Sequence, residues 1–230
     1  MSDKGQLFVV GTPIGNLEDI TLRAISTLKS VNLVLAEDTR VSKKLLDAHK
    51  IKTKMMSYHE HSSVKEIKKI VDFLLNGKDL ALISDAGTPT ISDPGYGLIR
   101  DCIKNGIAII PVPGASAISA AISISGLPSD SFTFYGFLPQ KKGRLKKIQD
   151  LIHFNNTIIL FESPYRLEKT LKQLLENLGD RPVVVGRELT KLYEEIIRGN
   201  LEDVIKYFSK SKVKGEIVIM IGKDDDRINF

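Results

Sequence analysis

The feature that most constrains the fold is a repeated order in the first half of the chain. A short apolar run is followed by a loop rich in glycine and proline, and then by a helical pattern. The apolar runs predict buried strands at residues 7–10, 31–36, 80–83 and 107–112. Apolar residues at helical spacing predict helices at residues 21–30, 63–75 and 96–105. Strands that alternate with helices in this way predict a parallel α/β sheet.

The second half follows a different order, with more strands that can form hairpins. Strands are predicted at residues 132–137, 157–161, 182–186, 194–198 and 216–221, and helices at residues 115–125, 164–178 and 201–208. Between the halves, the stretch Pro111-Val112-Pro113-Gly114 should interrupt regular structure. We therefore expect two α/β domains, residues 1–112 and residues 113–230.

The composition is that of an ordinary globular protein, with 42% hydrophobic and 27% charged residues. No apolar run approaches the roughly 18 residues of a membrane span, and residues 1–5 lack the apolar core of a signal peptide. The single Cys102 excludes an internal disulfide and a cysteine-based zinc site, so we expect a cytoplasmic protein. The formal net charge of +5 fits either simple solubility or a polyanionic partner.

Loops that follow strands are the places to look for a ligand, because open α/β sheets bind ligands at the carboxyl ends of their strands. The loop after the first strand has Gly11 and Gly15, half of a dinucleotide fingerprint, but Pro13 removes an amide that a phosphate would need. A tight turn is the simpler interpretation. The loop at residues 84–95 contains two aspartates, two prolines and no lysine. It favours adenosine, ribose or an amino-acid group over a triphosphate.

Charged residues follow several other strands. Glu37, Asp38 and Arg40 fit two interpretations, a helix N-cap with a solvated arginine or a substrate contact. His59 and His61 are two residues apart and would not share a helix face, so we expect no metal site. The loops at residues 161–166 and 186–191 each place a carboxylate beside a basic residue. In the first of them, Ser163 and Pro164 are typical of a helix start.

Seven motifs together resemble one family. They are "GTPIGNLEDIT" at 11–21, "EDTR" at 37–40, "SDAGTPTISDPG" at 84–95, "PVPGASA" at 111–117, "GFLP" at 136–139, "FESPYR" at 161–166 and "GRELTK" at 186–191. In this order they resemble the tetrapyrrole-methylase-like (class III) S-adenosylmethionine methyltransferases, and within them the enzymes that methylate small-subunit ribosomal RNA. The resemblance implies two α/β domains with the cofactor, S-adenosylmethionine, in a cleft between them.

The resemblance also implies an activity and a set of contacts. The activity is 2′-O-methylation of a cytidine in the decoding region of small-subunit (16S) ribosomal RNA, by a homodimer. A methyltransferase acting on a tetrapyrrole carbon is an alternative on the same fold, and a non-enzymatic, cofactor-binding RNA regulator is another. The implied cofactor contacts are Pro13, Ser84, Asp85, Ala86, Gly87, Pro89, Ser116, Ala117, Phe161, Glu162, Arg187, Glu188 and Thr190.

A ribose hydroxyl is a weak nucleophile, so a base or an orienting group should help it. The candidate catalytic residues at strand ends are Glu37, Asp38, Asp85 and Glu188, with Arg40 or Arg187 holding a phosphate. A basic run offers further RNA contacts at Lys141, Lys142, Arg144, Lys146 and Lys147. Such a run also fits a solvated helix face.

Overall fold

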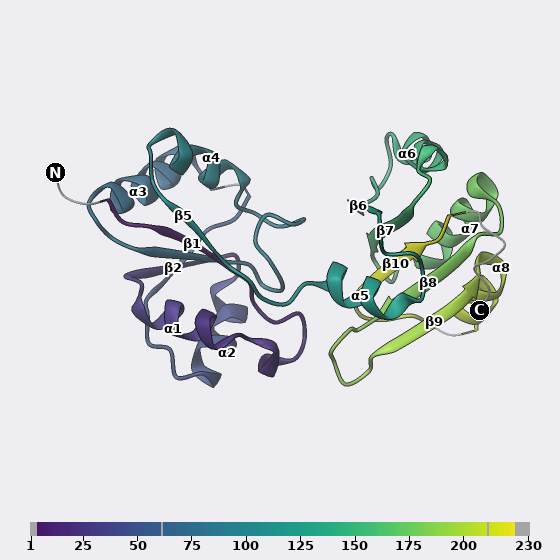
Figure 1. The fold of residues 1–230 in the computed structure, drawn as a ribbon, viewed down its shortest axis with the longest axis horizontal. Helices are drawn as coiled ribbons and strands as arrows, with labels where there is room; N and C mark the ends of the chain where they lie inside the picture. Colours follow the sequence, from purple (N-terminus) through teal and green to yellow (C-terminus); the bar gives the residue numbers. More distant parts are fainter. Residues whose placement is uncertain (1–3, 61, 211, 224–230) are drawn as a thin grey trace. The chain divides into compact units, whose positions relative to one another are not determined.

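The computed structural model describes residues 4–60, 62–210 and 212–223. The chain forms two compact units that divide between Ser116 and Ala117 (Figure 1). Within the described ranges, no helix is both long enough and apolar enough to cross a membrane. Each unit has its own sheet and its own core.

The N-terminal unit contains a sheet of five parallel strands. They are β1 (Leu7–Val10), β2 (Leu33–Ala36), β3 (Met55–Ser57), β4 (Leu80–Ile83) and β5 (Ile109–Val112), in the order β3-β2-β4-β1-β5. Every ladder between them is parallel, so all five carboxyl ends meet at one edge. The parallel sheet that the alternation predicts is confirmed.

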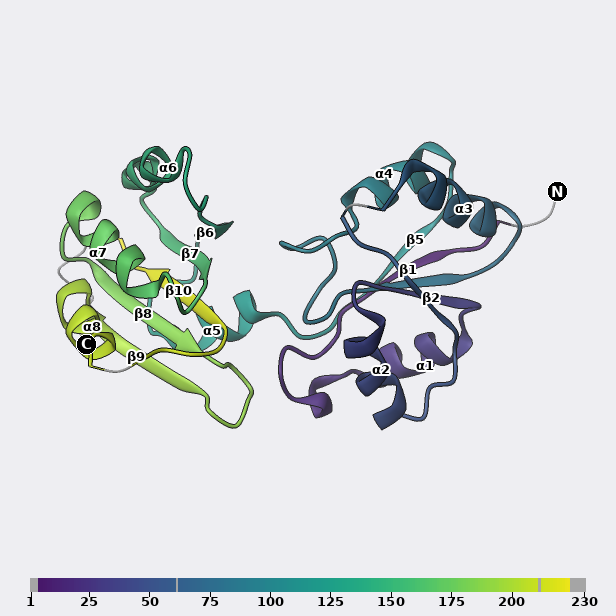
Figure 2. The ribbon, with the colours of Figure 1, turned by 180° about the vertical axis from the view of Figure 1, so that it is seen from behind.

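Helices cover both faces of this sheet (Figures 1 and 2). One face packs against α1 (Leu22–Ser30) and α2 (Thr39–Ala48), the other against α3 (Val64–Leu75) and α4 (Tyr96–Lys104). Successive residues of β4 alternate between the two cores, with Ala81 and Ile83 in one and Leu80 and Leu82 in the other. Burial on both sides explains why the strands read as unbroken apolar runs. A short 3₁₀ helix, η1 (Leu17–Asp19), follows β1.

The C-terminal unit has a mixed sheet. Its strands are β6 (Phe132–Phe137), β7 (Thr157–Glu162), β8 (Pro182–Arg187), β9 (Glu195–Asn200) and β10 (Ile217–Ile221), in the order β6-β7-β10-β8-β9. The β6–β7 pair is parallel and the other pairs are antiparallel. A register shift between Phe134 and Gly136 interrupts the β6 ladder.

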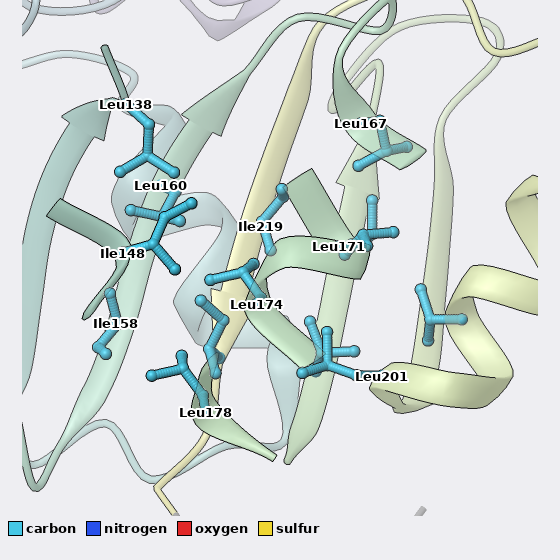
Figure 3. Close-up of a cluster of buried hydrophobic side chains, with 14 of the residues drawn as sticks. Leu138, Ile148, Ile158, Leu160, Leu167, Leu171, Leu174, Leu178, Leu201 and Ile219 are labelled. Carbon is cyan, nitrogen blue, oxygen red and sulfur yellow. The ribbon is translucent and has the colours of Figure 1, made fainter. Parts of the chain in front are cut away.

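One face of this sheet carries most of the C-terminal core. It packs against α6 (Arg144–Asp150), the 3₁₀ helix η2 (Leu151–His153), α7 (Leu167–Leu178) and α8 (Leu201–Phe208). Figure 3 shows leucine and isoleucine side chains from these helices pointing toward those of the strands. On β10, Ile217, Ile219 and Ile221 belong to this core. Helix α5 (Ala117–Ser125) contacts the same strand, whose buried Val218 and Met220 point to the opposite face.

Several details differ from the sequence predictions. Pro111 and Val112 lie inside β5 and do not interrupt it. The strand tolerates a proline because β5 is an edge strand, paired with β1 alone. Helix α7 begins at Leu167 and its N-cap is Arg166, so the predicted start at Ser163 and Pro164 is wrong. Ser163 instead accepts a turn hydrogen bond from the Arg166 amide at 2.9 Å.

Candidate functional site

Two motif loops touch at the carboxyl edge of the N-terminal sheet. They follow β1 and β4, which are neighbours in the sheet. The Thr12 amide donates to the Gly87 carbonyl at 2.8 Å, and the Gly87 amide donates back to Thr12 at 3.1 Å. The Thr12 hydroxyl lies 3.2 Å from the Ser84 carbonyl oxygen. Thr12, which the sequence did not single out, therefore connects the first motif (residues 11–21) to the third (residues 84–95).

A third loop, which follows β5, packs against the first through glycine. A Cβ added to Gly114 would lie 2.6 Å from the Gly11 carbonyl oxygen, and one added to Gly11 would lie 2.8 Å from Gly114 Cα. Side chains at either position would push the two loops apart. Glycine at both positions brings the loops of residues 11–16 and 113–116 into backbone contact.

Two of the motif loops contain unusual backbone geometry. In the loop of residues 84–95, Thr90 and Ser92 have φ of 75° and 65°. In the loop of residues 186–191, Glu188 and Thr190 have φ of 51° and 65°. Among the described residues only Lys50 joins them as a non-glycine residue with positive φ. Such conformations concentrate at functional sites, where the surrounding structure holds them in place. The loop of residues 84–95 ends at Gly95, which precedes α4 with φ 141°.

Carboxylates gather at the same edge of the N-terminal sheet. The Asp38 amide donates to Asp85 Oδ1 at 3.0 Å. Burial raises the pKa of Glu37, and the negative charges of Asp85 and Asp93 raise it further. Burial also raises the pKa of Asp93, against a hydrogen bond from Ser84 that lowers it. The structure thus brings together three of the candidate catalytic residues and adds Asp93, eight positions after Asp85.

Asp38 and Arg40 form a close pair at the start of α2. Asp38 caps the helix by accepting from the Arg40 amide at 2.8 Å, so the N-cap interpretation is confirmed. Arg40 Nε and Nη2 contact the two carboxylate oxygens at 3.0 and 2.6 Å. The Arg40 hydrogen bonds lower the pKa of Asp38 to about 2. The Arg40 side chain is 89% exposed, so its outer face remains open to a ligand.

The other predicted cofactor residues of the N-terminal unit are small and mostly enclosed. Pro13, Ser84, Gly87 and Pro89 are buried, whereas Asp85 and Ala86 are exposed. Ser116 ends this unit and Ala117 begins α5 of the C-terminal unit. The residues at 84–89 therefore present backbone atoms and two accessible positions rather than a wall of large side chains.

In the C-terminal unit, Phe161 and Glu162 point to opposite faces of β7. Glu162 has the same parity along the strand as Ile158 and Leu160, which face the core under α6 and α7. Phe161 faces the other side, with its ring 5.0 Å from that of Phe134 and 5.6 Å from that of Phe137. Only Phe161 of this predicted pair lies on the partly exposed side of the sheet.

The Glu162 carboxylate is fully enclosed by partners. Oε1 accepts from Arg166 Nη2 at 2.6 Å and from the Ser163 amide at 2.7 Å. Oε2 accepts from Thr170 Oγ1 at 2.5 Å and lies 3.3 Å from Arg144 Nη2. All of its lone pairs are thus occupied within the unit, so this carboxylate, which the resemblance implies as a cofactor contact, has no free acceptor for the cofactor.

The structure also contradicts the prediction made for Arg144. The basic run predicts Arg144 as an RNA contact, but its side chain is only 6% exposed and joins the Glu162 cluster, so it is not available to RNA. It also donates to Gln173 Oε1 at 2.9 Å and to the Pro139 carbonyl at 3.1 Å. Arg144 precedes the buried Ile148 by four residues, so α6 turns both toward the core. The exposed lysines of the run are Lys141, Lys142, Lys146 and Lys147.

The predicted charges after β8 are engaged in ion pairs. Arg187 Nε lies 2.8 Å from Glu195 Oε2, and Glu188 Oε1 lies 3.0 Å from Lys191 Nζ. Glu188 also accepts from the Glu216 amide at 2.9 Å. The Thr190 hydroxyl oxygen is buried and has no hydrogen-bond partner among the described residues.

Sequence reasoning missed several of these contacts. Thr12 and Asp93 act through loop-to-loop contacts that no spacing rule reveals. Phe161 and Glu162 point to opposite faces of the sheet because successive residues of a strand alternate in direction, and this pattern could have been read from the sequence. Within the described ranges, no three His, Cys, Asp or Glu residues are arranged to hold a metal ion, and His61 lies outside those ranges.

Comparison with protein families gives one extensive match. The family model described as Tetrapyrrole (Corrin/Porphyrin) Methylases matches residues 6–205. The Ribosomal RNA small subunit methyltransferase I of Thermotoga maritima is 49% identical over 96% of this chain and 100% of its own length. The proteins of the same name from Halalkalibacterium halodurans and Bacillus subtilis are 49% and 46% identical, over 98% and 99% of this chain and 78% and 79% of their own lengths.

Solved structures match over nearly the whole chain at lower identity. A cobalt precorrin-4 methyltransferase has a TM-score of 0.69 at 23% identity, with 94% of each chain covered. A uroporphyrin-III C-methyltransferase from Thermus thermophilus, complexed with S-adenosylhomocysteine, has a TM-score of 0.66 at 20% identity. That match covers 95% of this chain and 97% of the other. These likenesses confirm the predicted fold class of two α/β units.

Proposed function

We propose, because this chain belongs to the tetrapyrrole (corrin/porphyrin) methylase family, that it is an S-adenosylmethionine-dependent methyltransferase of small-subunit ribosomal RNA. The observation that carries the proposal is the 46–49% identity, over 96–99% of the chain, to proteins named Ribosomal RNA small subunit methyltransferase I. The tetrapyrrole alternative rests on structures of 20–23% identity, and these support the fold alone.

The finer proposal is 2′-O-methylation of a cytidine in the decoding region. It comes from the motif resemblance, as do the homodimer and the cytoplasmic location. The alternative acceptor on this fold, a uroporphyrin- or precorrin-type tetrapyrrole, carries many carboxylate side chains and would need cationic partners. The strand-end carboxylates of the N-terminal unit, Glu37, Asp38, Asp85 and Asp93, instead suit an acceptor with hydroxyl donors, such as a ribose.

The N-terminal loops fit the proposed cofactor in their chemistry. S-adenosylmethionine has ribose hydroxyls and an amino group, which are hydrogen-bond donors, and an adenine that accepts from backbone amides. Asp85 is exposed beside Glu37 and offers a carboxylate to such donors. Gly87, with φ 81°, lets the backbone of residues 84–89 approach a ligand closely. When bound, the cofactor supplies a methyl group on a sulfonium, which passes to the acceptor by in-line displacement.

The proposed cofactor contacts then divide by their surroundings. Pro13, Ser84, Asp85, Ala86, Gly87 and Pro89 remain in the proposal with Ser116, Ala117, Phe161, Arg187, Glu188 and Thr190. The Glu162 carboxylate already has hydrogen-bond partners for all of its lone pairs. Its part in the proposed cofactor site is therefore limited to its backbone and to holding Phe161 in position. The chain's part in the reaction is to bind and orient.

Among the candidate catalytic residues, Glu37 is the one best suited to accept a proton from a ribose hydroxyl. Its raised pKa makes it a stronger base than an ordinary carboxylate. Asp38 is held by Arg40 and has a pKa of about 2, so it suits electrostatic positioning better than proton transfer. The exposed guanidinium of Arg40 suits a phosphate of the RNA. Glu188, paired with Lys191, is a weaker candidate base.

One experiment separates the activities. The purified chain is supplied with methyl-labelled S-adenosylmethionine and, separately, with small ribosomal subunits, free small-subunit RNA, or a uroporphyrin or precorrin substrate. We expect label in the RNA, in a dinucleotide that resists alkali, because a 2′-O-methyl group removes the hydroxyl that attacks the phosphodiester. Label on a base would overturn the 2′-O assignment alone, and label only in the tetrapyrrole would overturn the RNA proposal.

A second experiment tests the roles of the carboxylates. Glu37→Gln, Asp85→Asn and Glu188→Gln are compared for turnover and, by calorimetry, for cofactor affinity. We expect Glu37→Gln to lose turnover by about 10²-fold or more while it retains cofactor affinity. Asp85→Asn should weaken cofactor binding. Equal turnover in Glu37→Gln and the wild type would remove Glu37 from the mechanism and leave positioning as the main contribution.

A further inference from the structure

The C-terminal unit contains a pocket lined mainly by polar and charged residues, two of which, Arg187 and Glu188, are also proposed cofactor contacts. Its volume is about 340 Å³. It lies where β8 ends, β9 begins and the segment before β10 returns from α8. Six of its lining residues carry the argument, and they are Arg187, Tyr193, Glu195, Tyr207, Lys212 and Lys214.

The acidic side chains of this pocket are neutralised from within. Glu195 accepts from Arg187 Nε at 2.8 Å and from the Tyr207 hydroxyl at 2.6 Å. Glu188, which also lines the pocket, is paired with Lys191. By contrast, Lys212 and Lys214 are exposed, and no carboxylate among the described residues pairs with either ammonium group. The pocket therefore has an excess of positive charge on the side of these two lysines.

Tyr193 lies in the β8–β9 connection, two residues before β9, with 69% of its surface exposed. The connection is not a loose loop. The Thr190 amide donates to Glu194 Oε2 at 2.6 Å, and the Glu194 amide donates to the Lys191 carbonyl at 3.1 Å. The positive φ of Glu188 and of Thr190 tightens the turn further. The exposed ring of Tyr193 is thus carried by a turn whose backbone is ordered by internal hydrogen bonds.

An exposed ring on a structured turn, beside unpaired lysines, is an arrangement by which proteins bind single-stranded nucleic acid. The ring stacks on a base and the ammonium groups contact backbone phosphates. An acidic peptide would use the lysines but would leave the face of the tyrosine without a partner. The volume of the pocket suits one nucleotide rather than a duplex.

We infer that this pocket binds a nucleotide of single-stranded RNA, with Tyr193 stacked on the base and Lys212 and Lys214 on the adjoining phosphates. The inference rests on the proposed function, since it assigns a second contact to the same RNA substrate. Arg187 and Glu188 line the pocket and also belong to the proposed cofactor contacts. The competing occupant is therefore the cofactor itself, and the test includes it.

The stacking contact is tested by fluorescence anisotropy with the full chain and labelled single-stranded RNA of about ten nucleotides, a length in the range of single-strand binding sites. A matched abasic strand has the phosphates without the bases. Tyr193→Ala should weaken binding to the RNA by about tenfold and leave the abasic strand nearly unchanged. Tyr193→Phe keeps the ring and should bind as the wild type does.

The phosphate contacts are tested by the salt dependence of the same binding. Lys212→Gln combined with Lys214→Gln should reduce the slope of log K against log salt by about 1.4, at about 0.7 for each phosphate of a single strand. The control is Lys172→Gln combined with Lys206→Gln, which removes the same charge from lysines in helical ion pairs of the same unit. The control should keep the wild-type slope.

The outcomes separate this inference from the proposed function. If the wild type methylates ribosomal RNA but Tyr193→Ala and the Lys212/Lys214 variant bind and turn over RNA normally, the pocket assignment fails alone. If these variants instead lose affinity for S-adenosylmethionine, the pocket belongs to the cofactor and the inference is overturned. A wild-type chain that neither binds nor methylates RNA overturns both. A raised KM for RNA in the variants, with the cofactor KM unchanged, supports the inference.

Discussion

The strand-end carboxylates of the N-terminal unit lie close to other carboxylates, whereas those of the C-terminal unit lie close to arginine and lysine. Glu37 and Asp93 have raised pKa values, through burial and through neighbouring negative charge. Glu195 has a lowered pKa, because Tyr207 and Arg187 hydrogen-bond to it. The first arrangement costs stability unless a ligand compensates for it, and the second supports the fold.

The two sheet topologies explain this difference. In the parallel sheet, successive strand ends meet at one edge, so the loops after β2 and β4 bring Glu37 and Asp85 together. In the antiparallel β8–β9 hairpin, Arg187 lies directly opposite Glu195 in the register. A hairpin places opposite charges across from each other, and such pairs stabilise the sheet. We therefore expect substitutions in the two units to affect stability in different ways.

The largest expected effect is at Glu162, the centre of the buried cluster. Glu162→Ala leaves Arg144 and Arg166 without their shared carboxylate, and the Arg144 side chain is only 6% exposed. Breaking a buried ion pair on one side costs about 3–5 kcal/mol in the free energy of unfolding. Urea unfolding followed by circular dichroism measures the change.

The control for this substitution is Glu168→Ala on α7, which removes an exposed pair with Lys172. An exposed helical pair of this kind contributes about 0.3–0.5 kcal/mol. If Glu162→Ala cost no more than Glu168→Ala, the buried cluster would not stabilise the unit, and the Glu162 carboxylate would again be a candidate for contact with the cofactor.

The next effect is in the N-terminal unit, where two loops are in backbone contact. Gly114→Ala would place a Cβ 2.6 Å from the Gly11 carbonyl oxygen. Overpacking of this kind costs about 1–3 kcal/mol, and separation of the loops should also weaken cofactor binding. Calorimetric affinity for S-adenosylmethionine, measured together with urea unfolding, checks both expectations.

Gly97→Ala is the matched control, because an added Cβ there has nothing within 4 Å and the residue lies in α4. It should stabilise the chain slightly, since alanine is the better helix former. Normal cofactor binding by Gly114→Ala would show that the contact between residues 11 and 114 does not shape the site.

Much of the N-terminal unit follows from its sequence, because its strands are short, apolar and bounded by glycine and proline. The runs at residues 7–10 and 80–83 became β1 and β4 with the same bounds. The motif loops were also visible, since each follows such a run. Their mutual contacts were not, because Thr12 and Gly87 meet through the packing of neighbouring strands and not through any local pattern.

The C-terminal unit was harder to predict where charge and burial conflict. Arg144 sits among four lysines in the sequence, and only its spacing to Ile148 indicates that it turns inward. Glu162 is the last residue of the apolar strand β7, and strand alternation alone places it on the core side. The exposure of Tyr193 depends on the turn of residues 188–194, which combines positive φ angles, a local bond from Thr190 to Glu194 and tertiary bonds between Glu188 and Glu216.

A smaller effect is the dependence of stability on pH, which should have opposite signs for Glu37 in the N-terminal unit and Glu195 in the C-terminal unit. For Glu37, the unfolded chain releases its proton at the ordinary pKa of 4.5 and the folded chain only at a higher pH. The contribution of Glu37 to the free energy of unfolding therefore falls as the pH rises from the unfolded pKa to the folded pKa. For Glu195, the folded pKa lies below the ordinary value of 4.5. Its contribution to the free energy of unfolding is therefore lost as the pH falls from 4.5 through the folded pKa.

Carboxyl ¹³C NMR titration of the chain measures both groups, with Glu37→Gln and Glu195→Gln to assign the signals. We expect the Glu37 midpoint above 4.5 and the Glu195 midpoint below it. Asp38, which is in the N-terminal unit but paired with Arg40, should follow the second pattern with a midpoint of about 2. Identical midpoints for Glu37 and Glu195 would break the comparison between the units.

The smallest effect on stability is expected at the exposed end of the basic run. Lys141→Gln combined with Lys142→Gln should change the free energy of unfolding by less than about 0.5 kcal/mol, because both side chains are exposed. If the run contacts RNA phosphates, the same variant should reduce the salt slope of single-strand RNA binding by about 1.4. Lys68→Gln combined with Lys69→Gln, an exposed adjacent pair on α3, is the matched control. Equal slopes in the two variants would leave the run as a solvated surface and confine the RNA contacts of this unit to the pocket beside Tyr193.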